Sequence, residues 1–157
     1  MHPKVLLVCG YKNVGKTRLM TLLIKELTTL GYRVASIKHD GHEFDMPGSD
    51  SDRHHQAGAY ASAVFSDTKW AMVKDESLDL AAIIDKFSDA DIILIEGCKH
   101  SPYPKIEVLR KGVHEELRDD LHRIAIVADF PLAQPNVYHY EHPQPLVELI
   151  VKEIIHD

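Results

Sequence analysis

Residues 10–17 constrain the fold of this chain more than any other segment, and they read Gly-Tyr-Lys-Asn-Val-Gly-Lys-Thr. They match the pattern G-x-x-x-x-G-K-[ST], in which glycines let the main chain curl so that successive N–H groups converge. A short apolar run at residues 4–9 precedes them, and leucines at helical spacing follow in residues 17–30. A strand, a glycine-rich turn and a helix in this order indicate a phosphate-binding loop.

Each residue type in this loop has a chemical role. Converging main-chain N–H groups and the positive end of the following helix replace the water that a polyphosphate loses on binding. Lys16 would reach the β- and γ-phosphates, and the Thr17 hydroxyl would bind Mg²⁺, a hard cation that prefers oxygen ligands. We therefore predict that a nucleoside triphosphate is bound by Gly10, Tyr11, Lys12, Asn13, Val14, Gly15, Lys16 and Thr17.

Strand-like and helix-like patterns alternate along the rest of the chain. They predict strands at residues 33–38, 61–66, 69–74, 91–96, 105–110 and 123–128, of which 105–110 alternates as a half-exposed strand does. They predict helices at residues 51–57, 78–87, 114–120 and 143–156. Strands separated by helix-length segments imply a mostly parallel sheet covered on both sides, whereas the short Asp67-Thr68 connection predicts an antiparallel hairpin. The predicted fold is α/β, with three layers, of the P-loop NTPase type.

Length and charge narrow the class of protein. The chain has 157 residues, which predicts one nucleotide-binding domain over residues 1–157. Its 18 Lys and Arg residues against 24 Asp and Glu residues argue against a general nucleic-acid binder, whose surface is basic. We expect no membrane span, because no apolar run reaches about eighteen residues. The N-terminus lacks a signal-peptide pattern, so we expect a cytoplasmic protein with Cys9 and Cys98 reduced.

Two carboxylates are candidates for a metal site beside Thr17. Glu96 ends the apolar run at 91–96, and ligands gather at the carboxyl ends of parallel strands, so Glu96 would lie near Thr17 if the two strands are neighbours. There it would hold Mg²⁺ through water or polarise an attacking water; the alternative is a glutamate that faces solvent. Asp40 would bind the metal or the γ-phosphate, or only form the turn before Gly41.

Recognition of the base has no standard signature in this chain. Guanine is commonly read by an Asn/Thr-Lys-x-Asp motif, which is absent from the sequence. Asp129, after the predicted strand at 123–128, would accept hydrogen bonds from N1–H and the N2 amino group of guanine. The equally open alternative is that Asp129 forms a turn before Pro131.

Histidines and basic residues form a further set of candidates. His39, His42, His54 and His55 fall in or near a polar segment at 40–53, but they lack the cysteines and the regular spacing of a structural zinc site. One interpretation is that basic side chains at 53–55 and 99–105 bind an anionic ligand. The alternative is that these side chains are only solvated. The residues concerned are Arg53, His54, His55, Lys99, His100 and Lys105.

Several short segments together resemble the MobB family of molybdopterin-guanine dinucleotide biosynthesis adaptor proteins. They are residues 10–17, Ile37-Lys38-His39 with His42, Pro47 to Ser51, Ala57-Gly58-Ala59, Trp70-Ala71, Glu96 to His100, Lys105-Ile106 and Val127 to Pro131. The resemblance spans residues 4–131, with Ser49 standing where the family commonly has lysine.

The resemblance implies a dimeric GTP-binding protein that uses Mg²⁺ and hydrolyses GTP only weakly. Its implied partner is a MobA-like guanylyltransferase, which attaches GMP to molybdopterin. The phosphate of molybdopterin would then be the anion met by Arg53, Lys99, His100 and Lys105. In such a protein, Lys16 and Glu96 would carry whatever hydrolysis occurs.

Two other functions stay open from the residues alone. A small-molecule kinase or ligase that uses ATP, similar to dethiobiotin synthetase, has the same type of phosphate loop but needs an acceptor pocket and a lid. A metal-delivering GTPase would use the histidines, but this sequence lacks both the guanine motif and a Cys-His ligand set.

Overall fold

The computed structural model describes residues 3–39, 41 and 48–157. They form two compact units, one within residues 1–39 and 84–157 and the other within residues 40–83, so that a single domain over 1–157 stays a prediction. The elements, in chain order, are β1 (Lys4–Cys9), α1 (Lys16–Thr29), β2 (Val34–Lys38), α2 (Asp50–Gln56), β3 (Ala61–Phe65), β4 (Trp70–Lys74), α3 (Leu80–Asp85), β5 (Ile92–Glu96), β6 (Lys105–Leu109), β7 (Arg123–Ala128), β8 (Val137–Tyr138), α4 (Gln144–Ile150) and the π-helical turn η1 (Val151–Ile155).

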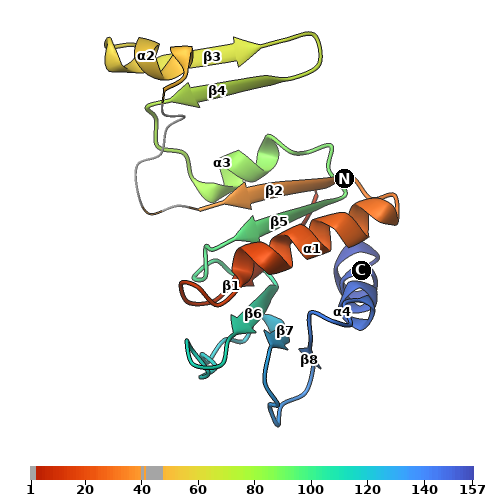
Figure 1. Cartoon of the computed structure of the whole chain (residues 1–157). Helices are drawn as coiled ribbons and strands as arrows, with labels where there is room; N and C mark the ends of the chain where they lie inside the picture. The colour runs from red at the N-terminus through yellow and green to blue at the C-terminus, as the bar shows by residue number, and fades with distance from the viewer. Residues whose placement is uncertain (1–2, 40, 42–47) are drawn as a thin grey trace. The chain divides into compact units, whose positions relative to one another are not determined.

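A parallel sheet forms the centre of the first unit, in the strand order β2-β5-β1-β6-β7-β8 (Figure 1). Every neighbouring pair in this sheet is parallel, as the helix-length spacing of the strands predicts. β1 lies between β5 and β6, with Val8 opposite Glu96 and Cys9 opposite Glu107. The carboxyl ends of β1, β5 and β6 therefore meet at one edge of the sheet.

One face of this sheet is covered by α1, α4 and η1, which lie on the same side of the strands (Figure 1). Alternate strand residues such as Leu6 and Leu94 pack there against Leu23 and Leu27 of α1, and all four side chains are fully buried. The leucine spacing of residues 17–30 thus predicted the buried side of α1 correctly for Leu19, Leu23 and Leu27, whereas Leu30, just after the helix, is 59% exposed. The helix ends before Gly31, whose φ of +92° is the left-handed conformation typical of a glycine that follows a helix.

The opposite face of the central strands is buried as well, since Leu7, Ile93 and Ile95 have no exposed surface. This agrees with their continuous apolar runs. Over β6 and β7, a small second cluster of Leu109, Ile126 and Ala128 packs against side chains from irregular segments, among them Leu117 and Phe130.

The prediction of a half-exposed strand at 105–110 was wrong, because β6 is buried along its whole length. Its alternating charges do not face water: Lys105 and Glu107 are each only 3% exposed. Lys105 Nζ lies 3.0 Å from Asp120, and Glu107 pairs with Arg123 at 2.8 Å and Arg118 at 3.5 Å. Buried ion pairs therefore produce the alternation that sequence alone assigns to a solvated face.

The helix predicted at 114–120 was also wrong, because these residues form an irregular segment over β6. The main-chain N–H of Arg118 donates to the Glu107 carboxylate at 3.1 Å, and Asp120 reaches Lys105. This N–H group bonds to a buried charge rather than to a helical carbonyl. The two-residue strand β8 was missed, since it is too short to show periodicity.

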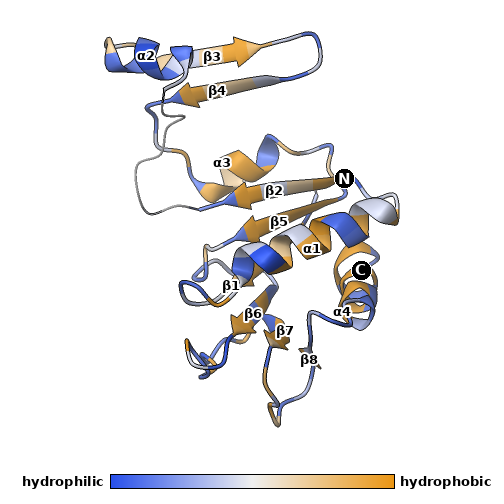
Figure 2. Cartoon of the chain, viewed as in Figure 1, coloured by the Kyte–Doolittle hydropathy of each residue, from blue (hydrophilic) through white to orange (hydrophobic). Residues whose placement is uncertain are grey.

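The second unit contains α2 and the antiparallel hairpin of β3 and β4, which confirms the hairpin prediction. Ser49 caps α2, because its Oγ accepts a hydrogen bond from the Asp52 N–H at 3.1 Å. Figure 2 shows that both strands of the hairpin are largely hydrophobic. Phe65 and Trp70, which face each other across the strands, are nevertheless 84% and 73% exposed.

The C-terminal helix predicted at 143–156 is present as α4 followed by η1, with a proline in its first turn. Within the described ranges, no helix has the length and apolar character needed to cross a membrane.

Candidate phosphate site

The loop between β1 and α1 is a tight curl that admits only glycine at two positions. A Cβ on Gly10 would lie 2.8 Å from the carbonyl oxygen of Val108, and one on Gly15 would lie 2.6 Å from the Tyr140 hydroxyl. Gly15 also has a φ of +106° and is the N-cap of α1, where it offers no side-chain oxygen to the first turn. The first turn of α1 therefore presents main-chain N–H groups and the positive end of the helix dipole, which suit an anion.

Lys16 directs its ammonium group back over this curl. Its Nζ donates to the carbonyl oxygens of Gly10 at 2.9 Å and Tyr11 at 3.3 Å. The cation therefore lies beside the converging main chain of residues 10–17, as a phosphate loop requires.

Thr17 and Glu96 meet at the shared edge of β1 and β5. The Thr17 hydroxyl lies 3.0 and 3.1 Å from the two carboxylate oxygens of Glu96. The two residues are 79 positions apart, and the parallel pairing of β1 with β5 brings them together. The sequence argument made this proximity depend on neighbouring strands, and the strands are neighbours.

These two groups fit Mg²⁺, because a hydroxyl and a carboxylate are oxygen ligands of the kind that the ion prefers, and phosphate and water commonly complete its shell. Asp40, the third predicted ligand, lies outside the described residues, as does His42. Among the residues that are described, no three His, Cys, Asp or Glu side chains form a metal-binding group.

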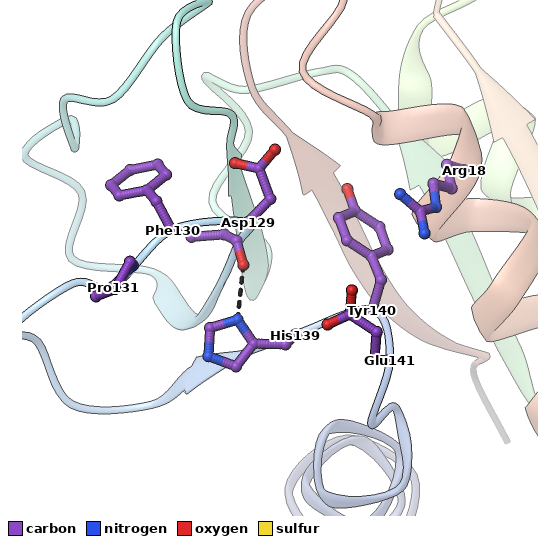
Figure 3. Close-up of a pocket in the computed structure, with 8 residues that line it drawn as sticks. Arg18, Asp129, Phe130, Pro131, His139, Tyr140 and Glu141 are labelled. Atoms are coloured by element: carbon purple, nitrogen blue, oxygen red, sulfur yellow. Dashed lines mark hydrogen bonds between the residues drawn. The ribbon is translucent and has the colours of Figure 1, made fainter.

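Asp129 lines a pocket of about 260 Å³ at the carboxyl ends of β7 and β8 (Figure 3). One of its carboxylate oxygens accepts the Lys111 N–H at 2.8 Å, and the His139 ring lies 2.8 Å from the carbonyl oxygen of Ala128. Asp129 therefore both supports a turn and faces a pocket. The lining residues are Arg18, Ala128, Asp129, Phe130, Pro131, His139, Tyr140 and Glu141.

Tyr140 connects this pocket to the phosphate loop, and sequence reasoning did not identify it. Its hydroxyl donates to the carbonyl oxygen of Gly15 at 3.2 Å, and the Arg18 guanidinium lies 4.2 Å from its ring centre. Burial raises the pKa of Tyr140, while the positive charge of Arg18 acts in the opposite direction, so the hydroxyl stays protonated and remains a donor.

Arg110 was missed as well, although it contacts the middle of the loop. Its Nη1 donates to the carbonyl oxygen of Asn13 at 3.2 Å. Nearby, the rings of His114 and Tyr11 lie 3.7 Å apart at 32°. A signal did exist, since Arg110 is the last residue of the strand predicted at 105–110. To use this signal, one had to know that this strand lies next to β1.

The predicted anion contacts are placed very differently from one another. Lys99 and His100 are exposed after β5. Lys105 is buried, and it donates to the carbonyl oxygens of Lys99 and Ser101 as well as pairing with Asp120. Its charge is therefore already compensated inside the protein. Arg53 lies in α2, in the other unit, 3.6 Å from Asp50.

The surroundings of both cysteines disfavour the thiolate form. Burial raises the pKa of Cys9, although the positive charges of Lys105 and Arg118 partly oppose it, and burial also raises the pKa of Cys98. A thiol with a raised pKa stays protonated at neutral pH and reacts slowly. Both cysteines are free.

Comparison with known proteins gives consistent matches. The family model for molybdopterin guanine dinucleotide synthesis protein B, MobB, matches residues 5–129. A molybdopterin-guanine dinucleotide biosynthesis adapter protein of Escherichia coli (strain K12) is 37% identical over 139 residues, which cover 82% of this chain and 79% of the relative. A protein of the same description from Haemophilus influenzae is 35% identical over 132 residues, covering 80% and 74%.

Solved structures agree with these matches. The crystal structure of Bacillus subtilis MobB superposes with a TM-score of 0.76 at 25% identity, covering 98% of this chain and 99% of that one. A MobB homologue from Bacillus stearothermophilus gives a TM-score of 0.66 at 24% identity, covering 95% and 96%. They confirm the predicted α/β fold of the P-loop NTPase type. From the match of sequence and fold over most of its length, this chain belongs to the MobB family.

Proposed function

We propose that this protein is a GTP-binding adaptor in the biosynthesis of molybdopterin guanine dinucleotide, where it assists a MobA-like guanylyltransferase. The observation that carries the proposal is the phosphate loop, with Lys16 over its curl and the Thr17 hydroxyl 3.0 Å from Glu96. The descriptions of the relatives as adapter proteins of this biosynthesis support the pathway.

In this proposal, residues 10–17 wrap the phosphates, Lys16 neutralises their charge, and Thr17 and Glu96 hold Mg²⁺. When bound, the ion adds positive charge to the phosphate oxygens. Both oxygens of Glu96 lie within 3.1 Å of the Thr17 hydroxyl, so we assign Glu96 to holding the metal, which leaves no carboxylate in this proposal to activate a water. We therefore propose only weak GTP hydrolysis.

Asp129 is proposed to select guanine. Its Oδ1 is fixed by the Lys111 N–H, so its Oδ2 can accept from guanine N1–H or the N2 amino group. Adenine carries no donor at these positions, and its N1 lone pair would face the carboxylate. The expected result is a preference for GTP over ATP, which Asp129→Ala should abolish while phosphate binding persists.

We also propose that the adaptor is a homodimer. The exposed apolar side chains of the hairpin support this, because exposed apolar patches mark interaction surfaces. Lys99 and His100 in one unit, and separately Arg53 in the other, are proposed contacts for the phosphate of molybdopterin. The internal ion pair of Lys105 favours a structural role for that residue.

The decisive experiment is a titration with GTP and Mg²⁺ of the Lys16→Ala variant. We expect its affinity to fall at least tenfold, because the ammonium next to the phosphates is lost. Lys25→Ala is the matched control, since it removes an exposed lysine from the same helix, further along α1. Unchanged GTP affinity in a folded Lys16→Ala variant would refute the proposed site.

A second assay tests the adaptor role and the alternative of an ATP-using enzyme. Purified guanylyltransferase should form more molybdopterin guanine dinucleotide with the wild type than with Lys16→Ala. Phosphorylation of an added small molecule with ATP, in the absence of the guanylyltransferase, would contradict the adaptor role.

A further inference from the structure

We propose that Arg110 is a second cation of the phosphate site and contacts a phosphate of the nucleotide. This inference rests on the proposed nucleotide binding by residues 10–17. It assigns a ligand-contacting role to a side chain that lies 97 positions away from the loop in the sequence.

The sheet order places Arg110 at the loop. β6 pairs with β1 on the side opposite β5, and Arg110 is the first residue after β6. Its Nη1 donates to the carbonyl oxygen of Asn13 at 3.2 Å. Asn13 lies in the middle of the loop, with a φ of +65° that turns its main chain sharply. Arg110 and Glu96 therefore approach the phosphate loop from opposite sides of β1.

The turn that carries Arg110 is held in place by its own contacts. Arg110 and His114 exchange two main-chain hydrogen bonds of 3.0 Å, and the His114 ring stacks on Tyr11 of the loop. The next N–H, that of Lys111, bonds to Asp129 at 2.8 Å. The guanidinium is therefore positioned before a ligand arrives, which lowers the entropy cost of a contact.

The guanidinium of Arg110 has a different kind of partner from the guanidinium groups of the other arginines. Arg33, Arg53, Arg118 and Arg123 pair with carboxylates. Arg18 lies over the ring of Tyr140. In the part of the chain that the structure describes, Arg110 forms no salt bridge and instead bonds to a loop carbonyl. A carbonyl oxygen has only a partial negative charge, so a phosphate would attract this guanidinium strongly.

Lys16 makes the same kind of contact from within the loop, to the carbonyl oxygens of Gly10 and Tyr11. Lys16 and Arg110 thus both contact the loop, each through different carbonyl oxygens. A guanidinium has five N–H donors, so the bond to Asn13 leaves donors for phosphate oxygens, and its planar fork suits them.

The test compares GTP affinity, measured by calorimetry, in Arg110→Lys, Arg110→Gln and Arg110→Ala. Gln is uncharged and too short to reach the Asn13 carbonyl in place of Nη1, whereas Lys is also shorter than Arg but retains the charge. We expect Gln and Ala to weaken GTP binding about tenfold, and Lys to weaken it less than Gln. A merely structural role would give no such order, because neither Gln nor Lys reproduces the guanidinium bond to Asn13.

Arg33→Gln is the matched control, because it removes one exposed guanidinium that precedes β2, at the amino-terminal edge of the sheet. Its GTP affinity should equal that of the wild type, and thermal unfolding verifies that every variant is folded. If Arg110→Gln binds GTP as the wild type does, or if Arg110→Lys is no better than Arg110→Gln, the inference is overturned. Unchanged binding in Lys16→Ala would instead refute the proposed nucleotide site, so the two failures are distinguishable.

Discussion

Strand β5 and the β3–β4 hairpin are both rich in apolar residues, yet their side chains have opposite environments. Ile92, Ile93, Leu94 and Ile95 have no exposed surface. In the hairpin, the large side chains of Phe65, Trp70 and Met72 are mostly exposed. The apolar residues of β5 are covered by this chain, whereas those of the hairpin remain available to another one. An apolar sequence pattern therefore shows that a strand belongs to the core only when the elements that pack against the strand are known.

The largest expected effect is on the buried strand. Leu94→Ala removes a fully buried side chain between β1 and β2 in the sheet and leaves a cavity against α1. We expect a loss of about 3 kcal/mol in the free energy of unfolding, measured with urea. Met72→Ala, in the hairpin, serves as the comparison and should lower the free energy of unfolding far less. Equal losses in the two variants would remove the contrast between these regions.

The next effect concerns the buried charges of β6. Glu107→Gln would leave Arg118 and Arg123 without their carboxylate partner, and we expect a loss of about 2 kcal/mol. Glu153→Gln, in an exposed pair with Lys152, should change stability by less than about 0.5 kcal/mol. Urea unfolding of both variants measures the difference. A stability of Glu107→Gln equal to that of the wild type would mean that the arginines are well solvated.

A smaller effect should appear in acid through Asp120. Burial alone would raise the pKa of Asp120, but hydrogen bonds from the His122 N–H and from Lys105 outweigh burial and lower it. The carboxylate therefore stabilises the fold above about pH 4, and this contribution is lost as the pH falls through the lowered pKa. We expect the wild type to lose more stability than Asp120→Asn between about pH 6 and about pH 3. If the free energy of unfolding depends on pH in the same way in the wild type and in Asp120→Asn, the pairing of Asp120 with Lys105 is contradicted.

The smallest effect on unfolding is expected in the hairpin itself. Trp70→Ser should change the free energy of unfolding by less than about 0.5 kcal/mol in dilute solution, because its side chain is already exposed. It should nevertheless weaken self-association, measured by analytical ultracentrifugation. Thr68→Ala, in the adjoining turn, is the control. A variant that associates as the wild type does would exclude the hairpin from the dimer interface.

Much of the fold was predictable because its signals are local. Residues 4–9 and 91–96 are continuous apolar runs, residues 17–30 have helical leucine spacing, and the short connection at Asp67-Thr68 is typical of a hairpin. The two errors, at 105–110 and 114–120, share one cause. Charged residues in both segments bind one another across the fold, and periodicity cannot distinguish a paired buried charge from a solvated one.

For the candidate site, the sequence by itself determined the curl of residues 10–17 that we propose as a phosphate loop, since the curl depends on glycines and a helix start within eight consecutive residues. It also identified Glu96 from the end of an apolar run. Only the tertiary structure decided that Glu96 reaches Thr17, that Arg110 reaches Asn13 and that Tyr140 reaches Gly15. These contacts depend on the order of strands in the sheet, which is set by long-range packing of the whole core and not by any local pattern.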